Sequence, residues 1–230
     1  MKLFYDPITT FSRPVMMFIA EHRIPVRLEV VSLLQGEHKS PEFLKINPNG
    51  CVPALADGEF VLTECAAILQ YLAELAQSPA YPQEPRRRAR VNSALGWFQT
   101  NFHSALGHEL AYPTLYPAMF PLSPTAYGEV TAAGLAGTRR WLAVLDEHMI
   151  GPDRNYVAGE DLTLADYVGA SCTMLAEAIS FDLSAYPNVR RWMGTMKARP
   201  SWDETYAAFY GLISAIRPTS QPALSIALTG

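Results

Sequence analysis

The chain has 230 residues, of which 49% are hydrophobic and 17% charged, and its formal net charge is −4. This mildly acidic balance gives no reason to expect nucleic acid or an anionic membrane surface as a partner, and no apolar run reaches the about 18 residues of a membrane-spanning helix. Three cysteines without metal-ligand spacing predict reduced thiols, no disulfide framework and no metal. We therefore expect a cytoplasmic globular protein of one or two domains.

The first part of the chain, residues 1–76, has the pattern of a small α/β domain. Short strands are expected at residues 2–6, 26–33, 51–55 and 60–62, and helices at residues 12–23, 41–45 and 64–76. The order β-α-β-α-β-β-α predicts a thioredoxin-like layer with helices on both faces of the sheet. Ser12 is expected to cap the first helix. The alternation of Val26, Leu28 and Val30 favours a strand at 26–33.

Turn residues fix the local structure of residues 47–65. Asp57-Gly58 predicts a hairpin, and a helix should begin at Thr63 or Glu64. Pro53 cannot donate to a sheet, so it marks an edge, a bulge or a cis peptide and leaves the Val52 backbone free to pair with an extended ligand. Glu64 could bind a ligand ammonium there, or could only complement the helix dipole.

The second part of the chain is helical. Residues 77–85 contain three prolines and predict a linker to a second domain at residues 86–216. Helices are expected at residues 86–110, 127–148, 164–179, 189–198 and 202–216, with an aromatic, proline-rich break at 112–124 and a tail at 217–230. Thr163 and Asp166 fit a capping box. The sequence leaves open whether the tail covers a binding site.

The spacing of the N-terminal motifs resembles the glutathione site of cytosolic glutathione transferases, most closely the theta class. The residues that carry the resemblance are Gly36 to Ser40, Val52-Pro53, Asp57 to Phe60 and Leu62 to Glu64. The match runs without gaps from Leu3 to about Tyr71. It implies the fold of these enzymes, an α/β thioredoxin-like domain followed by an all-α bundle. It also implies a homodimeric detoxification enzyme that associates through the helices expected at 64–76 and 86–110.

The resemblance implies a partner for each end of glutathione. Glu64 would bind the γ-glutamyl ammonium, and the Cys65 backbone N–H would bind the adjoining carboxylate. The Val52 backbone would pair with the cysteinyl amide by β-augmentation. His38 and Lys39 would face the glycyl carboxylate. Theta enzymes usually have serine at the position of Cys65, so binding should be weaker here by about one hydrogen bond.

Three hydroxyls of the first loop compete for the role of activating the glutathione thiol. By resemblance, Thr9 falls on the usual catalytic serine, Ser12 falls on a helix-start position, and Thr10 falls where beta-class enzymes carry a cysteine. Cys65 or Cys51 could instead be redox-active, although a buried, inert thiol is the simpler interpretation of Cys65.

An apolar pocket for the electrophile is expected between the two domains. Its candidate lining residues are Phe11, Trp97, His103, Tyr112 and Tyr116. The favoured interpretation is a glutathione transferase that activates the thiolate for attack on small hydrophobic electrophiles, by conjugation or glutathione-dependent dehalogenation. The alternatives are a glutathione-dependent thiol transferase or peroxidase, and a non-catalytic glutathione- or ligand-binding protein on the same scaffold.

Overall fold

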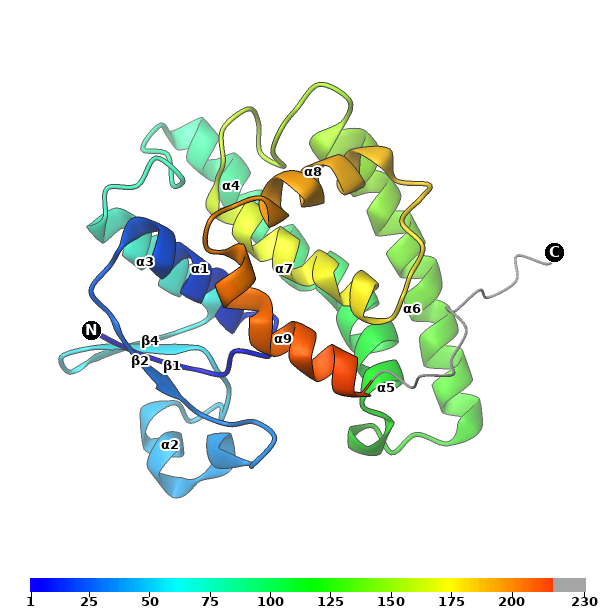
Figure 1. Cartoon of the computed structure of the whole chain (residues 1–230), viewed down its shortest axis with the longest axis horizontal. Helices are drawn as coiled ribbons and strands as arrows, with labels where there is room; N and C mark the ends of the chain where they lie inside the picture. Colours follow the sequence, from blue (N-terminus) through cyan, green and yellow to red (C-terminus); the bar gives the residue numbers. More distant parts are fainter. Residues whose placement is uncertain (217–230) are drawn as a thin grey trace.

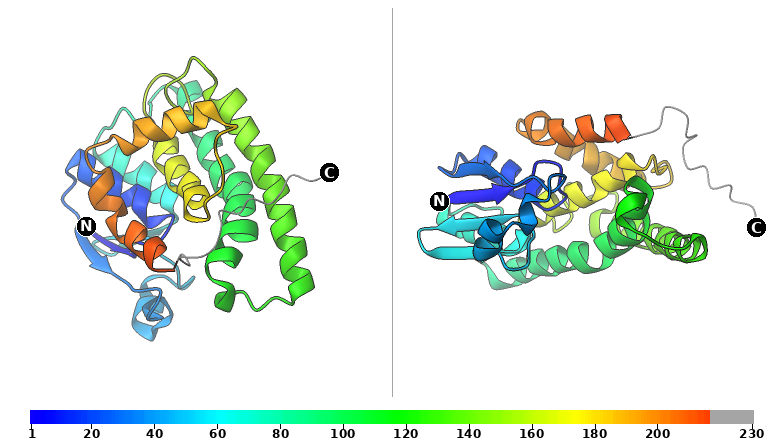
Figure 2. Two further views of the ribbon diagram at one scale, coloured as in Figure 1. Left: turned by 45° about the vertical axis from the view of Figure 1, so that its right-hand side comes forward. Right: turned by 90° about the horizontal axis from the view of Figure 1, so that it is seen from below.

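The structure, a computed structural model, describes residues 1–216, so the tail at 217–230 and any role in covering a site lie outside the described residues. A half that contains the sheet and a helical half lie side by side (Figures 1 and 2). Among the described residues, no helix is both long and apolar enough to cross a membrane.

The N-terminal half is built on a four-stranded mixed sheet with the strand order β2-β1-β3-β4. The strands are β1 (Lys2–Tyr5), β2 (Arg27–Val30), β3 (Ala54–Asp57) and β4 (Phe60–Thr63). The helices are α1 (Ser12–His22), the 3-10 turn η1 (Glu37–Lys39), α2 (Pro41–Ile46) and α3 (Cys65–Leu75). β1 runs parallel to β2 and antiparallel to β3, which pairs with β4 as the hairpin turning at Gly58.

Side chains of β1 alternate between two layers, as expected for a strand with helices on both faces. Leu3 is fully buried with residues of α1 and α3, whereas Phe4 faces Phe43 of α2 at 6.1 Å between ring centroids. Figure 1 shows α1 and α3 on one side of the sheet and α2 on the other. The predicted thioredoxin-like arrangement is confirmed.

The second strand forms as β2, an edge strand on which Leu28 and Val30 are 44% and 54% exposed. One local prediction in this half is wrong. Ser12 does not cap α1; it is the first helical residue, Phe11 occupies the N-cap position, and the Ser12 N–H donates to the Thr9 Oγ1 over 3.3 Å. The Ser12 hydroxyl instead faces the loop that precedes the helix.

The helical half begins at α4, after a segment at 76–84 with neither helix nor strand. Its elements are α4 (Pro85–Trp97), the π-helical segments η2 (Phe98–Phe102) and η3 (Ser104–Ala111), α5 (Tyr112–Leu115), η4 (Pro117–Met119), α6 (Pro124–Val144), the π-helical η5 (Leu145–Ile150), α7 (Leu164–Ala178), α8 (Pro187–Lys197) and α9 (Trp202–Ile216). The change from α- to π-helical winding after Trp97 was not predicted. Within residues 86–216 the only β-type pairing is an isolated bridge between Tyr156 and Gly159.

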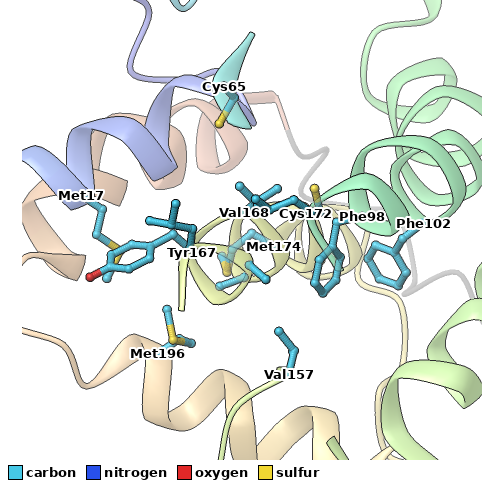
Figure 3. Packing of buried hydrophobic residues seen from close by; sticks show 14 of the residues in the cluster. Met17, Cys65, Phe98, Phe102, Val157, Tyr167, Val168, Cys172, Met174 and Met196 are labelled. Atoms are coloured by element: carbon cyan, nitrogen blue, oxygen red, sulfur yellow. The ribbon is translucent and has the colours of Figure 1, made fainter. Parts of the chain in front are cut away.

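Helix α7 is the centre of the molecule. All of its residues except Glu177 are buried, and it packs against α1 and α3 from one half and α4, η2, η3 and α8 from the other. Figure 3 shows its side chains between Met17, Cys65 and Phe98. The capping box at Thr163 and Asp166 is confirmed. The buried Asp166 carboxylate also accepts hydrogen bonds from the Val157 N–H and the Trp192 indole.

The close packing of α7 around Gly169 leads to a prediction about the free energy of unfolding. A Cβ at Gly169 would lie 2.3 Å from Cζ of Phe98, whereas a Cβ at Gly194 in α8 would meet nothing within 4 Å. We expect Gly169→Ala to lower the free energy of unfolding by about 1–3 kcal/mol, because overpacking outweighs the about 0.5–1 kcal/mol that alanine gains over glycine in a helix. Gly194→Ala should be neutral or stabilising. Urea denaturation measures both, and equal shifts of the two midpoints would contradict this account.

Candidate functional site

A cavity of about 410 Å³ lies between the two halves. It is lined by Ile8, Thr9, Thr10, Phe11, Leu33, Leu34, His38, Lys39, Gly50, Cys51, Val52, His103, His108, Tyr112, Tyr116, Met119, Leu175 and Phe209. The residues numbered below 53 come from the sheet-containing half, and the others come from η2–η4, α7 and α9. One wall is therefore loop backbone with a few polar groups, and the opposite wall is largely aromatic, a composition suited to a small ligand.

Thr9 is one of two first-loop hydroxyl residues on the cavity lining, and Ser12 lies behind it. The Thr9 Oγ1 lies 2.7 Å from the Ser12 Oγ and 2.9 Å from the Asp6 carbonyl oxygen. Ser12 is fully buried and does not line the cavity. A hydroxyl has one proton to donate, so the Thr9 proton can be redirected from these oxygens to a ligand while Ser12 and Asp6 keep its side chain in place.

A buried cation lies directly behind this hydroxyl. Arg13 is fully buried, and its Nε donates to the Thr9 carbonyl over 3.1 Å. Its guanidinium lies 3.8 Å from the ring centroid of Phe209, a favourable cation–π distance, and its two terminal nitrogens have no hydrogen-bond partner within residues 1–216. Burial lowers the pKa of Arg13, but a guanidinium stays charged at neutral pH. The positive charge of Arg13 therefore lies next to two residues of the cavity lining, Thr9 and Phe209.

The third hydroxyl, that of Thr10, is engaged with the helical half. Its Oγ1 lies 2.8 Å from the Tyr112 hydroxyl, and Thr10 is 5% exposed. Its carbonyl accepts a hydrogen bond of 2.6 Å from Ser171 of α7. Thr9 and Thr10 therefore face different walls of the cavity, although both lie on its lining.

The segments at 38–39 and 50–52 form the polar end of the cavity. Lys39 donates to the Gly50 carbonyl over 3.2 Å, and the Nδ1 atom of His38 is buried without a partner in the described part of the chain. The Val52–Pro53 peptide is cis, one of the three arrangements expected. No backbone hydrogen bond of Val52 is recorded within residues 1–216. A free strand end beside a lysine and an unpaired imidazole nitrogen fits an extended peptide that ends in a carboxylate.

Glu64 and Cys65 lie outside the cavity lining, at the N-terminus of α3. Glu64 is exposed and has a φ of 69°, a conformation that is rare for a residue other than glycine and concentrated at functional sites. Cys65 is 3% exposed, and burial raises the pKa of its thiol well above the ordinary value. A buried thiol of high pKa is unreactive, which argues against a redox role for Cys65. Cys51, in contrast, is exposed and lines the cavity.

Of the residues expected to line an electrophile pocket, Phe11 lies on the cavity lining from the sheet-containing half, and His103, Tyr112 and Tyr116 lie on the aromatic wall. Trp97 does not lie on the lining. Its ring packs against those of Phe98, Phe102 and Trp141, with centroids 5.0, 5.5 and 5.9 Å away. The lining residues that sequence reasoning missed on this wall are His108, Met119, Leu175 and Phe209.

Comparison with known proteins identifies the family. The family model for the glutathione S-transferase N-terminal domain matches residues 9–75, and the model for the C-terminal domain matches residues 110–200. The chain belongs to the glutathione S-transferase family. Human glutathione S-transferase theta-2 is 35% identical over 201 residues, which cover 86% of this chain and 81% of that protein. Glutathione S-transferase D7 of Drosophila melanogaster is 31% identical over 209 residues, covering 89% and 88%.

Solved structures agree with the transferase fold. Human glutathione transferase theta-2, in complex with glutathione, superposes with a TM-score of 0.85 at 29% identity and covers 96% of this chain and 92% of its own. A delta-class glutathione transferase of Nilaparvata lugens gives a TM-score of 0.80 at 30% identity, with 94% and 99% covered. The resemblance to theta-class transferases in the sequence is confirmed, as is the combination of a thioredoxin-like half with a helical half.

Proposed function

We propose that this transferase binds glutathione along the polar end of the cavity, converts its thiol to a thiolate, and adds the thiolate to small hydrophobic electrophiles at the aromatic wall. The reaction is conjugation, or dehalogenation where the electrophile carries a halide. The observation that carries this proposal is the place of Thr9. Thr9 lies on the cavity lining, and the cationic Arg13 lies behind it. The same lining includes Val52, with its unpaired backbone, and the aromatic wall.

Binding uses both ends of the tripeptide. Val52 offers its unpaired backbone to the cysteinyl residue, and His38 and Lys39 offer hydrogen bonds and charge to the glycyl carboxylate. At the other end, Glu64 takes the γ-glutamyl ammonium, and the N–H groups of the first turn of α3 take the adjoining carboxylate. Human theta-2, which this chain resembles, was solved in complex with glutathione.

Thr9 activates the thiol by donating its proton to the sulfur. A free thiol has a pKa of about 8.5, and one charge-assisted hydrogen bond of about 1.5–3 kcal/mol lowers it by about one to two units. The buried Arg13 charge acts in the same direction. A less basic thiolate is also a weaker nucleophile, so the gain in ionisation alone raises the rate only a few-fold. The further acceleration comes from holding sulfur and electrophile in contact between the two walls.

The transferase activity can be separated from its two rivals in one set of assays. We expect retention on immobilised glutathione together with turnover of an aryl halide. Retention with reduction of a mixed disulfide, lost in Cys51→Ser, would instead support a thiol transferase that uses the exposed Cys51. Retention with neither activity would support a non-catalytic binding protein and would contradict our proposal.

The role of Thr9 predicts a change in the acidity of bound glutathione. Thr9→Val removes the donor, so the pKa of the bound thiol should rise by about one unit or more with little change in glutathione affinity. Thr9→Ser keeps the hydroxyl and should keep the low pKa. The measurement is the ultraviolet thiolate absorbance of the binary complex against pH. If Ser12→Ala shifts the titration and Thr9→Val does not, Ser12 is the activating residue and this assignment is wrong.

The role of Glu64 predicts a loss of binding. Glu64→Ala leaves the γ-glutamyl ammonium without its partner and should cost about 2–3 kcal/mol of glutathione affinity, the range for hydrogen bonds to charged groups. Glu59→Ala serves as the matched control, because Glu59 is an exposed acid of the neighbouring hairpin. Calorimetry checks both variants. A fall of less than threefold for Glu64→Ala would remove this residue from the site.

We also propose a cytoplasmic homodimer. The three cysteines are free thiols, as expected in a reducing compartment. Leu75, Phe60 and Val61, at the end of α3 and on β4, are 53%, 51% and 40% exposed, and apolar side chains of this size are typical of an interface. The resemblance to the theta class implies an interface along α3 and α4. Light scattering at micromolar concentration tests the assembly, and a monomer would contradict it.

A further inference from the structure

Two carboxylates hold the segment that leads from β2 to the polar end of the cavity. The Ser32 N–H donates to the Glu37 carboxylate over 2.7 Å, and the Leu33 N–H donates to the Asp6 carboxylate over 2.8 Å. A backbone N–H only donates and a carboxylate only accepts, so the direction of both hydrogen bonds is fixed. Two consecutive N–H groups are therefore held by acids from two different parts of the chain.

The first of these acids belongs to the loop that carries Thr9. Asp6 directly follows β1 and is 4% exposed. Its other carboxylate oxygen accepts from the Ile8 N–H over 3.0 Å, and its carbonyl oxygen accepts from the Thr9 N–H over 3.1 Å. A shift of Leu33 away from Asp6 would therefore break a contact with the loop that positions the Thr9 hydroxyl.

The second acid belongs to the turn at the polar end of the cavity. Glu37 begins η1, and the two later residues of η1 line the cavity. The Glu37 N–H donates to the Ser32 carbonyl over 3.0 Å, so the backbone and the side chain of Glu37 both bind Ser32. The Gly36 N–H donates to the Leu33 carbonyl over 3.1 Å. The turn is therefore closed on the same two residues that the carboxylates hold.

The two segments connected in this way meet the cavity at the two places where glutathione is proposed to bind. Thr9 lies on the lining, and so do His38 and Lys39 of η1. A ligand that contacts two places at once binds tightly only if their separation is fixed at a value that matches its length. The two carboxylates therefore restrain a distance that the length of glutathione has to match.

We propose that Glu37 and Asp6 are positioning residues for glutathione. Their hydrogen bonds to consecutive N–H groups fix the distance between the Thr9 hydroxyl and the glycyl-carboxylate site at His38 and Lys39. This proposal rests on the function proposed above, in which these two places bind the thiol and the glycyl carboxylate. Neither acid is on the lining formed by the described part of the chain, so both act through the backbone segment that they hold.

The test compares glutathione with γ-glutamylcysteine, which lacks the glycine, by calorimetry on the full-length protein. The ratio of the two dissociation constants measures what the glycyl carboxylate contributes to binding. Wild-type protein should bind glutathione at least about tenfold more tightly, as expected for hydrogen bonds to a charged group. Glu37→Ala should reduce this ratio by about three- to tenfold, the range for one lost hydrogen bond. The affinity for γ-glutamylcysteine should change by less than about twofold, because Asp6 still holds the Thr9 loop.

Conservative variants separate the geometry from the charge. Glu37→Gln keeps an oxygen acceptor for the single Ser32 N–H and should keep the ratio within about twofold of the wild-type value. Asp6→Asn should reduce the ratio, because two N–H groups need two acceptor oxygens and asparagine has one. Glu42→Ala is the matched control, since Glu42 is an exposed acid of the neighbouring helix α2, and it should leave both affinities unchanged. Glu37 is also exposed, so its variants test the proposal even if Asp6→Asn does not fold.

Steady-state kinetics give a second readout. With an aryl halide as the electrophile, Glu37→Ala should raise KM for glutathione by about three- to tenfold and change kcat by less than about twofold, since the thiol site keeps its contacts. An unchanged affinity ratio in Glu37→Ala would overturn the proposal. Equal losses for both ligands would overturn it as well, because they would make Glu37 a structural residue of the whole site.

Two results with the wild-type protein separate this proposal from the function on which it rests. Equal affinities for glutathione and γ-glutamylcysteine, with turnover of the aryl halide, would overturn the role of Glu37 and Asp6 while leaving the transferase activity intact. If the protein binds neither ligand, the proposed function itself fails.

Discussion

The fixed conformation of the loop between β1 and α1 is the constraint on which the site depends. Buried carbonyl groups must find donors, and here the donors come from different parts of the molecule. The Thr9 carbonyl is held by Arg13 of α1, and the Thr10 carbonyl is held by Ser171 of α7. The Asp6 carboxylate accepts from the N–H groups of Ile8 and Leu33, which ties the loop to the segment after β2.

Because this loop is anchored from both halves, the geometry of the site depends on how the halves pack. α7 carries Ser171 and is buried between the sheet-side helices and the helical half. The carboxylate of Glu21 in α1 adds a second connection between the two halves. It accepts hydrogen bonds from Tyr167, Arg199 and Ser201 of the helical half. Substitutions in the core of α7 can therefore disturb the position of Thr9 without touching the cavity.

The features that could be predicted from the sequence are those determined by residues close together along the chain. The hairpin at Gly58, the capping box at Thr163 and the order of strands and helices follow from local turn and capping chemistry. Features that depend on distant contacts were missed or misassigned. Thr10 and Tyr112 are 102 positions apart, and the packing of Trp97 away from the cavity depends on Trp141 of another helix. The hydroxyl of Ser12 faces the loop instead of capping the helix, and the residues next to it in the sequence do not determine this orientation.

The π-helical winding of η3 has a consequence for how the chain can be compared with its relatives and how it can change. A π-helical turn holds about one residue more than an α-helical turn, so it accommodates what amounts to a single-residue insertion. Deleting one residue from Ser104–Ala111 would restore ordinary α-helical winding and leave the later side chains, Tyr112 among them, facing the same way. An alignment that runs without a gap through this segment would pair cavity residues of this chain with outward-facing residues of an α-helical relative, and the chemistry of the wall could diverge through changes in length as well as through substitutions.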